Sequence, residues 1–277
     1  MSVHTPVLDF AEGELVDTDL VSTSEPNQQP NQQPNQHIDL LISPRAVAKL
    51  LFCVVAVLAT VGTIADFLIF RVFGGREHKL SRLLNRIDLG FEPSVPAFYS
   101  SFALLAAAGL LALISIGEKQ RGGRHVWHWG ILAILFAGMS LDEMVMLHEL
   151  FVNSLRDSFD LHGVFLFSWV IPGMITVAVV GFCYLGFLFR LDARTRKLFI
   201  IAAVLFVGGA LGMEMIAGIL VESHGDGEAG LGSPSHIAAQ TVEETCEMLG
   251  IVVFVYALLC YIENQWGSLK FQLRSPE

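Results

Sequence analysis

Long apolar runs separated by short polar stretches dominate the chain from residue 46 onward. Six of these runs reach the roughly 20 residues that a helix needs to cross a hydrocarbon core of about 30 Å. They lie near residues 46–72, 97–117, 129–152, 164–189, 198–221 and 238–262. Because a backbone in lipid must satisfy its own hydrogen bonds, these runs predict helices. The pattern therefore predicts an all-α, polytopic transmembrane helix bundle, with a kink at Pro172 in the fourth span.

The first 43 residues differ from the rest of the chain in composition. They hold seven acidic residues and no Lys or Arg, and the stretch from Pro26 to Gln36 repeats P-N-Q-Q. Such a segment cannot bury enough apolar surface to offset the entropy that is lost on ordering. We therefore predict a disordered acidic tail over 1–43, a six-helix transmembrane domain over 44–264 and a short C-terminal tail over 265–277.

The composition narrows the class of protein further. Hydrophobic residues make up 53% of the chain, which is more than a soluble domain of this size sustains. The formal net charge of −10 argues against a nucleic-acid partner. The four cysteines all fall within apolar runs, which favours small buried side chains over a disulfide framework or a cysteine-based zinc site.

Lys and Arg residues in the loops predict the orientation of the bundle. With the N-terminus inside, the inner segments carry eleven of these residues and the outer loops carry six. Five of those six lie in the loop 71–86, which is the feature against this assignment, whereas the loop 222–237 has none. We predict a multi-pass membrane protein with both termini in the cytoplasm.

The basic loop 71–86 has a pattern of its own. Leu80, Leu83, Leu84 and Ile87 recur at helical spacing around it. That spacing predicts a short helix that lies in the membrane interface. Such a helix fits either a connector that holds phospholipid headgroups or a lid over a site.

The apolar runs also contain side chains that are costly in a membrane. One is a histidine, His148, and eight are carboxylates, which are Asp66, Asp142, Glu143, Glu149, Glu214, Glu243, Glu244 and Glu247. An acidic residue at the centre of a span costs roughly 2.5–3.5 kcal/mol on insertion. Ionisable residues at this depth indicate a functional site by default.

In the predicted topology these acidic residues share one level of the bilayer. The first, third and fifth spans run outward, and they place Asp66, the stretch 142–149 and Glu214 near or beyond their midpoints. The sixth span runs inward, so the stretch 243–247 lies in its first half, which is again the outer one. If the orientation is reversed, the shared depth survives.

Helical spacing indicates which side chains share a face in the third span. Asp142 and Glu149 are seven residues apart and fall on one stripe, with Glu143 and His148 to either side. This stripe is expected to face the inside of the bundle.

The sixth span has a similar polar face. Glu243 and Glu247 are four residues apart, and Glu244 lies close by. Gln240 and His236 extend the same stripe toward the start of the helix. The third and sixth spans are therefore expected to present their acids to a common space.

Neighbouring carboxylates in such number cannot all stay ionised in a low dielectric without a cation. Histidine with several carboxylates suits iron, manganese or zinc, and carboxylates with water also suit calcium. We therefore expect an outward-facing site for a divalent metal ion. The predicted ligands are Asp142, His148, Glu149, Glu214, Glu243 and Glu247, with Glu143, Glu244 and Asp66 placed around them.

Structural roles stay open for some of these residues. Glu243 and Glu244 also fit a helix that protrudes into water. Asp66 also fits a buried hydrogen-bond partner or a water-facing residue. The sequence lacks the two Glu-x-x-His pairs of a di-iron bundle, so that type of site is not predicted.

Two motifs carry a resemblance to known proteins. The run S-L-D-E-M-V-M-L-H-E, from Ser140 to Glu149, resembles a pattern of uncharacterised bacterial multi-span membrane proteins. The segment I-D-L-G-F-E-P-S-V-P-A-F-Y-S-S, from Ile87 to Ser101, is similar to the stretch before the second span in that group. The resemblance covers most of residues 80–262 and adds Glu92 to the candidate polar residues. It implies a bacterial inner-membrane protein and no particular activity.

Three functions fit these features. The first is a metal-dependent intramembrane hydrolase that acts on a membrane lipid, with Glu143 or Glu244 as general base. The second is a proton or divalent-cation transporter or channel, although the second and fourth runs lack charges. The third is a non-catalytic assembly or sensor protein, whose acidic tail recruits a cytoplasmic partner. The sequence leaves open whether the chain forms a homo-oligomer.

Overall fold

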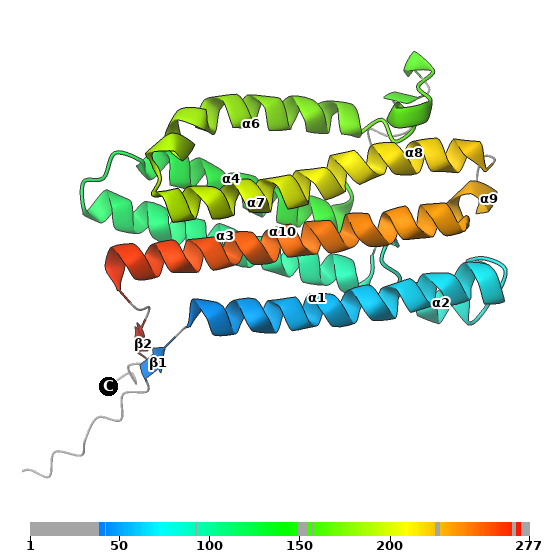
Figure 1. Cartoon of the computed structure of the whole chain (residues 1–277), viewed down its shortest axis with the longest axis horizontal. Coiled ribbons are helices and arrows are strands. Elements are labelled where there is room, and N and C mark those ends of the chain that lie inside the picture. The colour runs from blue at the N-terminus through cyan, green and yellow to red at the C-terminus, as the bar shows by residue number, and fades with distance from the viewer. Residues whose placement is uncertain are drawn as a thin grey trace, which may run out of the picture.

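The computed structural model describes residues 39–41, 43–91, 93–148, 155–156, 158–224, 228–267 and 270–272. Within these residues, six helices are long and apolar enough to cross a membrane (Figure 1). They are α1 with η1 (Pro44–Val72), α3 (Val95–Gln120), α4 (Val126–Val145), α6 (Val170–Arg190), α7 with η3 and α8 (Ala193–Ser223), and α10 (Pro234–Trp266). The prediction of an all-α bundle of six spans is confirmed.

Shorter elements complete the described chain. Two spans contain a π-helical segment, η1 (Leu68–Val72) and η3 (Gly208–Met213). Outside the spans lie α2 (Ser81–Leu84), η2 (Gly163–Phe165), α9 (Glu228–Leu231), β1 (Asp39–Leu41) and β2 (Lys270–Gln272). β1 pairs antiparallel with β2, so both ends of the bundle's chain meet at one side (Figure 1). β1 thus lies at the end of the tail that was predicted over 1–43, and residues 1–38 lie outside the described part.

α10 is the central helix, and α1, α3, α7 and α8 pack around it (Figure 1). Away from the acidic residues, the interior is a continuous apolar cluster that includes Leu111, Trp129, Phe199, Phe254 and Leu258. α7 approaches α10 closely at Gly250, where a Cβ atom would stand 2.8 Å from Phe206 N. Glycine at this position therefore allows the two backbones to pack directly.

α3 and α4 form an antiparallel hairpin that two serines lock together. Ser101 Oγ donates to Ser140 O at 2.8 Å, and Ser140 Oγ donates to Ser101 O at 2.8 Å. Both side chains are buried. Such reciprocal hydrogen bonds fix the register of two helices in an apolar surrounding.

Two predicted spans have different ends in the structure. The third was expected to continue to residue 152, but α4 ends at Val145. The fourth was expected to begin near residue 164 and to kink at Pro172, but α6 begins at Val170. Pro172 thus lies in the first turn, where its missing N–H is no loss and no kink follows.

The basic loop contains a short helix, as predicted. Only Ser81–Leu84 forms a regular helix. Leu83 is 69% exposed and Leu80 is 46% exposed, whereas Ser81 and Asn85 are buried. The segment therefore turns a polar face to the protein and its leucines outward.

Candidate functional site

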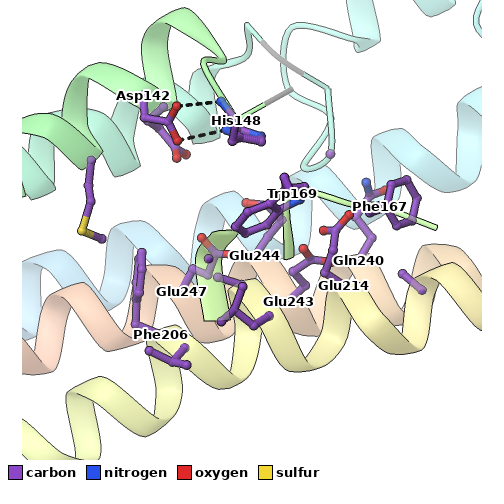
Figure 2. Close-up of a pocket in the computed structure, with 18 of the residues that line it drawn as sticks. Asp142, His148, Phe167, Trp169, Phe206, Glu214, Gln240, Glu243, Glu244 and Glu247 are labelled. Carbon is purple, nitrogen blue, oxygen red and sulfur yellow. Dashed lines mark hydrogen bonds and ion pairs between the residues drawn. The ribbon is translucent and has the colours of Figure 1, made fainter. Parts of the chain in front are cut away.

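The end of α4 holds Asp142 and His148 together. Met146 has a left-handed backbone with φ of 55°, and its N–H donates to Asp142 O at 2.7 Å. The chain then turns back, and Asp142 Oδ1 accepts a hydrogen bond from the His148 backbone N–H at 2.9 Å. Asp142 Oδ2 lies 3.0 Å from His148 Nδ1 (Figure 2). Asp142 therefore sets the orientation of the imidazole ring.

This turn corrects the predicted face of the third span. A helix continuing to residue 152 would place Asp142 and Glu149 on one stripe, but the helix ends before His148. A left-handed conformation costs a non-glycine residue roughly 1–2 kcal/mol, and the hydrogen bonds to Asp142 offset this cost at Met146. Glu149 lies outside the described residues.

One face of α10 supplies the largest share of the polar side chains. The helix begins at Pro234, and Ser233 Oγ accepts a hydrogen bond from the His236 N–H at 3.2 Å. Glu243 is only 8% exposed, so the alternative of a helix protruding into water is wrong for this residue. Glu244 is half-buried.

η3 and α8 bring Glu214 against α10. Gly209 of η3 lies so near α10 that a Cβ atom there would stand 2.8 Å from Glu243 O. The π-helical segment ends at Met213, directly before Glu214, and such segments are frequent at functional sites. The carboxyl group of Glu214 lies within hydrogen-bonding reach of that of Glu243, and Figure 2 shows the two side chains together.

These side chains line one cavity of about 680 Å³, bounded by α4, α6, α8 and α10. This volume is within the range of small-molecule and cofactor sites. Aromatic and apolar residues such as Phe167, Trp169 and Phe206 form the rest of its wall (Figure 2). The ring of Trp169 lies 5.2 Å from that of His148. The cavity thus combines an apolar wall with converging polar groups.

The cavity is strongly acidic. Its described lining includes six carboxylates and two histidines, which are Asp142, Glu143, Glu214, Glu243, Glu244, Glu247, His148 and His236. No Lys or Arg belongs to that described lining. His236 is 5% exposed, and its Nδ1 has no hydrogen-bond partner among the described residues.

The structure places most of the predicted site residues in this cavity, but it does not bring them close enough together to form a metal centre. Across the described part of the chain, no three His, Cys, Asp or Glu side chains are grouped closely enough to hold a metal ion. Whether they bind one stays a prediction. Asp66 does not belong to the described lining of the cavity, and its place around the metal stays a prediction. Glu92 lies outside the described residues.

Several residues of the site were not predicted from the sequence. All three aromatic residues, Phe167, Trp169 and Phe206, lie inside predicted apolar runs, so each reads as a lipid-facing or core residue. Gly90 belongs to the cavity wall because it packs directly on Gln240, where a Cβ atom would collide with the amide group. The only sequence signal for Gly90 is its place in the segment from Ile87 to Ser101.

Comparison with known proteins gives one match. Residues 50–261 match a family model described as Domain of unknown function (DUF8692). No curated protein and no solved structure matches the chain.

Proposed function

Because the chain belongs to the family described as Domain of unknown function (DUF8692), we propose its function from the geometry of the cavity. It is a multi-pass membrane protein that binds a divalent metal ion between α4, α8 and α10. The observation that carries this proposal is the acidic lining, in which the described residues include six carboxylates and no Lys or Arg. The six apolar helices support the membrane location.

Electrostatics requires a positive charge in this cavity. Two like charges 4 Å apart repel each other by about 4 kcal/mol at an effective dielectric constant of about 20. Glu214 and Glu243 lie within hydrogen-bonding reach, and Glu243 is almost fully enclosed. Protons or a cation must therefore compensate this pair. A divalent ion neutralises both carboxylates at once.

The chemistry of the side chains favours a metal ion over protons alone. Carboxylates and imidazoles are the common ligands of zinc, iron and manganese, and carboxylates with water suit calcium. The contact between Asp142 Oδ2 and His148 Nδ1 resembles the carboxylate–histidine pairs that orient metal ligands. His236 supplies a buried nitrogen, Nδ1, that has no hydrogen-bond partner among the described residues.

Ion binding would draw the flexible glutamates of the cavity together, because the described side chains are not grouped as a metal centre. We assign the ligand role to His148, Glu214, Glu243 and Glu247, and to Asp142 the role of holding His148. Glu149 stays a predicted ligand outside the described residues.

The position of the cavity favours a substrate from the membrane. Val177 of α6 belongs to the lining and is 40% exposed, which supports an opening of the cavity beside this helix. α6 is fixed to α4 at the other end, where Tyr184 Oη donates to His128 O at 2.9 Å. A lipid can therefore enter from the side. A bound metal ion would polarise its ester, phosphate or amide group, and Glu143 or Glu244 would serve as general base.

The apolar interior argues for a binding site rather than an ion path. Below the cavity, described residues such as Leu111, Trp129 and Phe254 fill the bundle with apolar side chains. A conduit needs polar groups along its whole length. We therefore rank transport of protons or divalent cations below a metal-dependent reaction.

The orientation completes the proposal. The inner segments carry eleven Lys and Arg residues and the outer loops six when the N-terminus is inside. We propose that both termini are cytoplasmic, which places the cavity in the outer half of the membrane. Accessibility of a tag at either terminus reports directly on which side of the membrane that terminus lies.

The metal content of the purified protein tests the proposal. We expect near-stoichiometric metal in the wild type by elemental analysis, and loss of the metal in Glu243→Gln. Glu263→Gln is the matched control, because Glu263 lies on the same helix, is exposed and does not line the cavity. Metal-free wild-type protein after growth with added zinc, iron, manganese and calcium would contradict the proposal. Metal-free protein that carries proton or cation flux in liposomes would favour transport instead.

A further inference from the structure

A second buried polar group lies outside the described lining of the cavity, at the junction of α1 and the basic loop. Asp66, Ser81 and Asp88 are completely buried, and Asn85 is 7% exposed. Asp66 comes from the end of α1. Ser81, Asn85 and Asp88 are spaced i, i+4 and i+7, so they share one face of the helical segment that begins at α2.

One basic side chain faces the two carboxylates of this group. The carboxyl group of Asp66 lies within hydrogen-bonding reach of that of Asp88. Asp88 Oδ2 lies 2.6 Å from Arg76 Nη1. The guanidinium group of Arg76 is also 5.2 Å from the ring centre of Phe70 and 5.0 Å from that of Phe91. When both carboxyl groups are ionised, two negative charges meet one positive charge, and a single negative charge is left to be balanced.

Oxygen atoms of this group also lack partners. Both carboxylate oxygens of Asp66, Asn85 Oδ1 and Ser81 Oγ have no hydrogen-bond partner among the described residues. A proton shared by Asp66 and Asp88 would balance the charge, but it would leave Asn85 Oδ1 without a partner. A monovalent ion that prefers oxygen ligands would satisfy both conditions. A divalent ion would leave an excess positive charge next to Arg76.

We propose that a sodium ion binds between Asp66 and Asp88, with Asn85 Oδ1 as a further ligand. Hard cations take carboxylate and amide oxygens as ligands, which is the chemistry of these three side chains. Arg76 holds Asp88 in place and is not displaced by the ion. The ion therefore fixes the segment that follows α2 to α1. Gly90 of that segment packs on Gln240 and lines the cavity, so the ion also supports one wall of the acidic site.

Thermal unfolding of the full chain in detergent micelles at pH 8 tests this proposal. The two salts are NaCl and N-methyl-D-glucamine chloride at equal ionic strength. We expect the midpoint to rise with sodium by about 3–5 °C for each tenfold increase above its dissociation constant, and not with the organic cation. Asp66→Asn should abolish the rise, whereas Glu243→Gln in the cavity should keep it. The sodium dependence of the midpoint is therefore expected even if the acidic cavity binds no metal ion.

Two outcomes would overturn the sodium site. Equal midpoints in the two salts would exclude a specific ion. A midpoint that rises only when the pH is lowered, in both salts alike, would identify a shared proton instead. If Asp66→Asn does not fold, Asn85→Ala replaces it, because it removes a neutral ligand. This variant should need more sodium for the same rise, and an unchanged sodium dependence would remove Asn85 from the ligands and overturn the proposed site.

Discussion

The substitution Gly209→Ala, which adds one methyl group, tests the contact between η3 and α10 directly. A Cβ atom there would lie 2.8 Å from Glu243 O and 3.0 Å from Glu247 Cγ. Glu243 O belongs to a helical backbone and cannot turn away, so Gly209→Ala must push η3 off α10. Overpacking of this kind costs typically about 1–3 kcal/mol. The same displacement would separate Glu214 from Glu243.

Gly212 supplies the matched control for this prediction. It lies on the same element, and a Cβ atom there would meet nothing within 4 Å. Both substitutions gain about 0.8–1 kcal/mol of helix propensity, so their difference isolates the clash. We expect Gly209→Ala to unfold at a lower temperature than Gly212→Ala, by about 2–4 °C for each kcal/mol of the clash. Equal midpoints in detergent micelles would refute the close packing of η3 on α10.

Two further predictions concern parts of the molecule away from the cavity. Ser101→Ala and Ser140→Ala should each destabilise the protein by about 0.5–1.5 kcal/mol. A double-mutant cycle should show coupling between the two substitutions, because each removes the partner of the other. Additive effects would be inconsistent with the reciprocal hydrogen bonds. The exposed His162 ring donates hydrogen bonds to the carboxylates of Asp160 and Glu222, and these bonds raise its pKa. Its stabilising contribution is therefore present at low pH and is lost as the pH rises through that raised pKa. An NMR titration should give a lower His162 pKa in Glu222→Gln, and an unchanged value would exclude the contact.

The spans could be predicted from the sequence because apolar length is a direct physical requirement of the bilayer. The acidic cavity followed from the same reasoning, since the faces of α10 and α8 place Glu214 and Glu243 at one depth. Both features depend only on helical geometry and on the cost of charge in lipid.

The turn after α4 could not be predicted, because Met146 carries no signal for a left-handed residue. Its conformation depends on hydrogen bonds to Asp142, a contact that forms only once the chain has turned back. The buried polar group around Asp66 could not be predicted because of the apolar pattern in the basic loop. Leu80 and Leu83 dominate the pattern of the basic loop, and they conceal the polar face formed by Ser81 and Asn85.

The most direct test of the central claim is anomalous diffraction from crystals of the protein grown with zinc or manganese. The account predicts an anomalous peak inside the acidic cavity, between Glu214, Glu243 and His148. It also predicts that the peak disappears in Glu243→Gln and persists in Glu263→Gln. A cavity without such a peak at full metal saturation, or a peak only at surface residues, would contradict the proposed metal site.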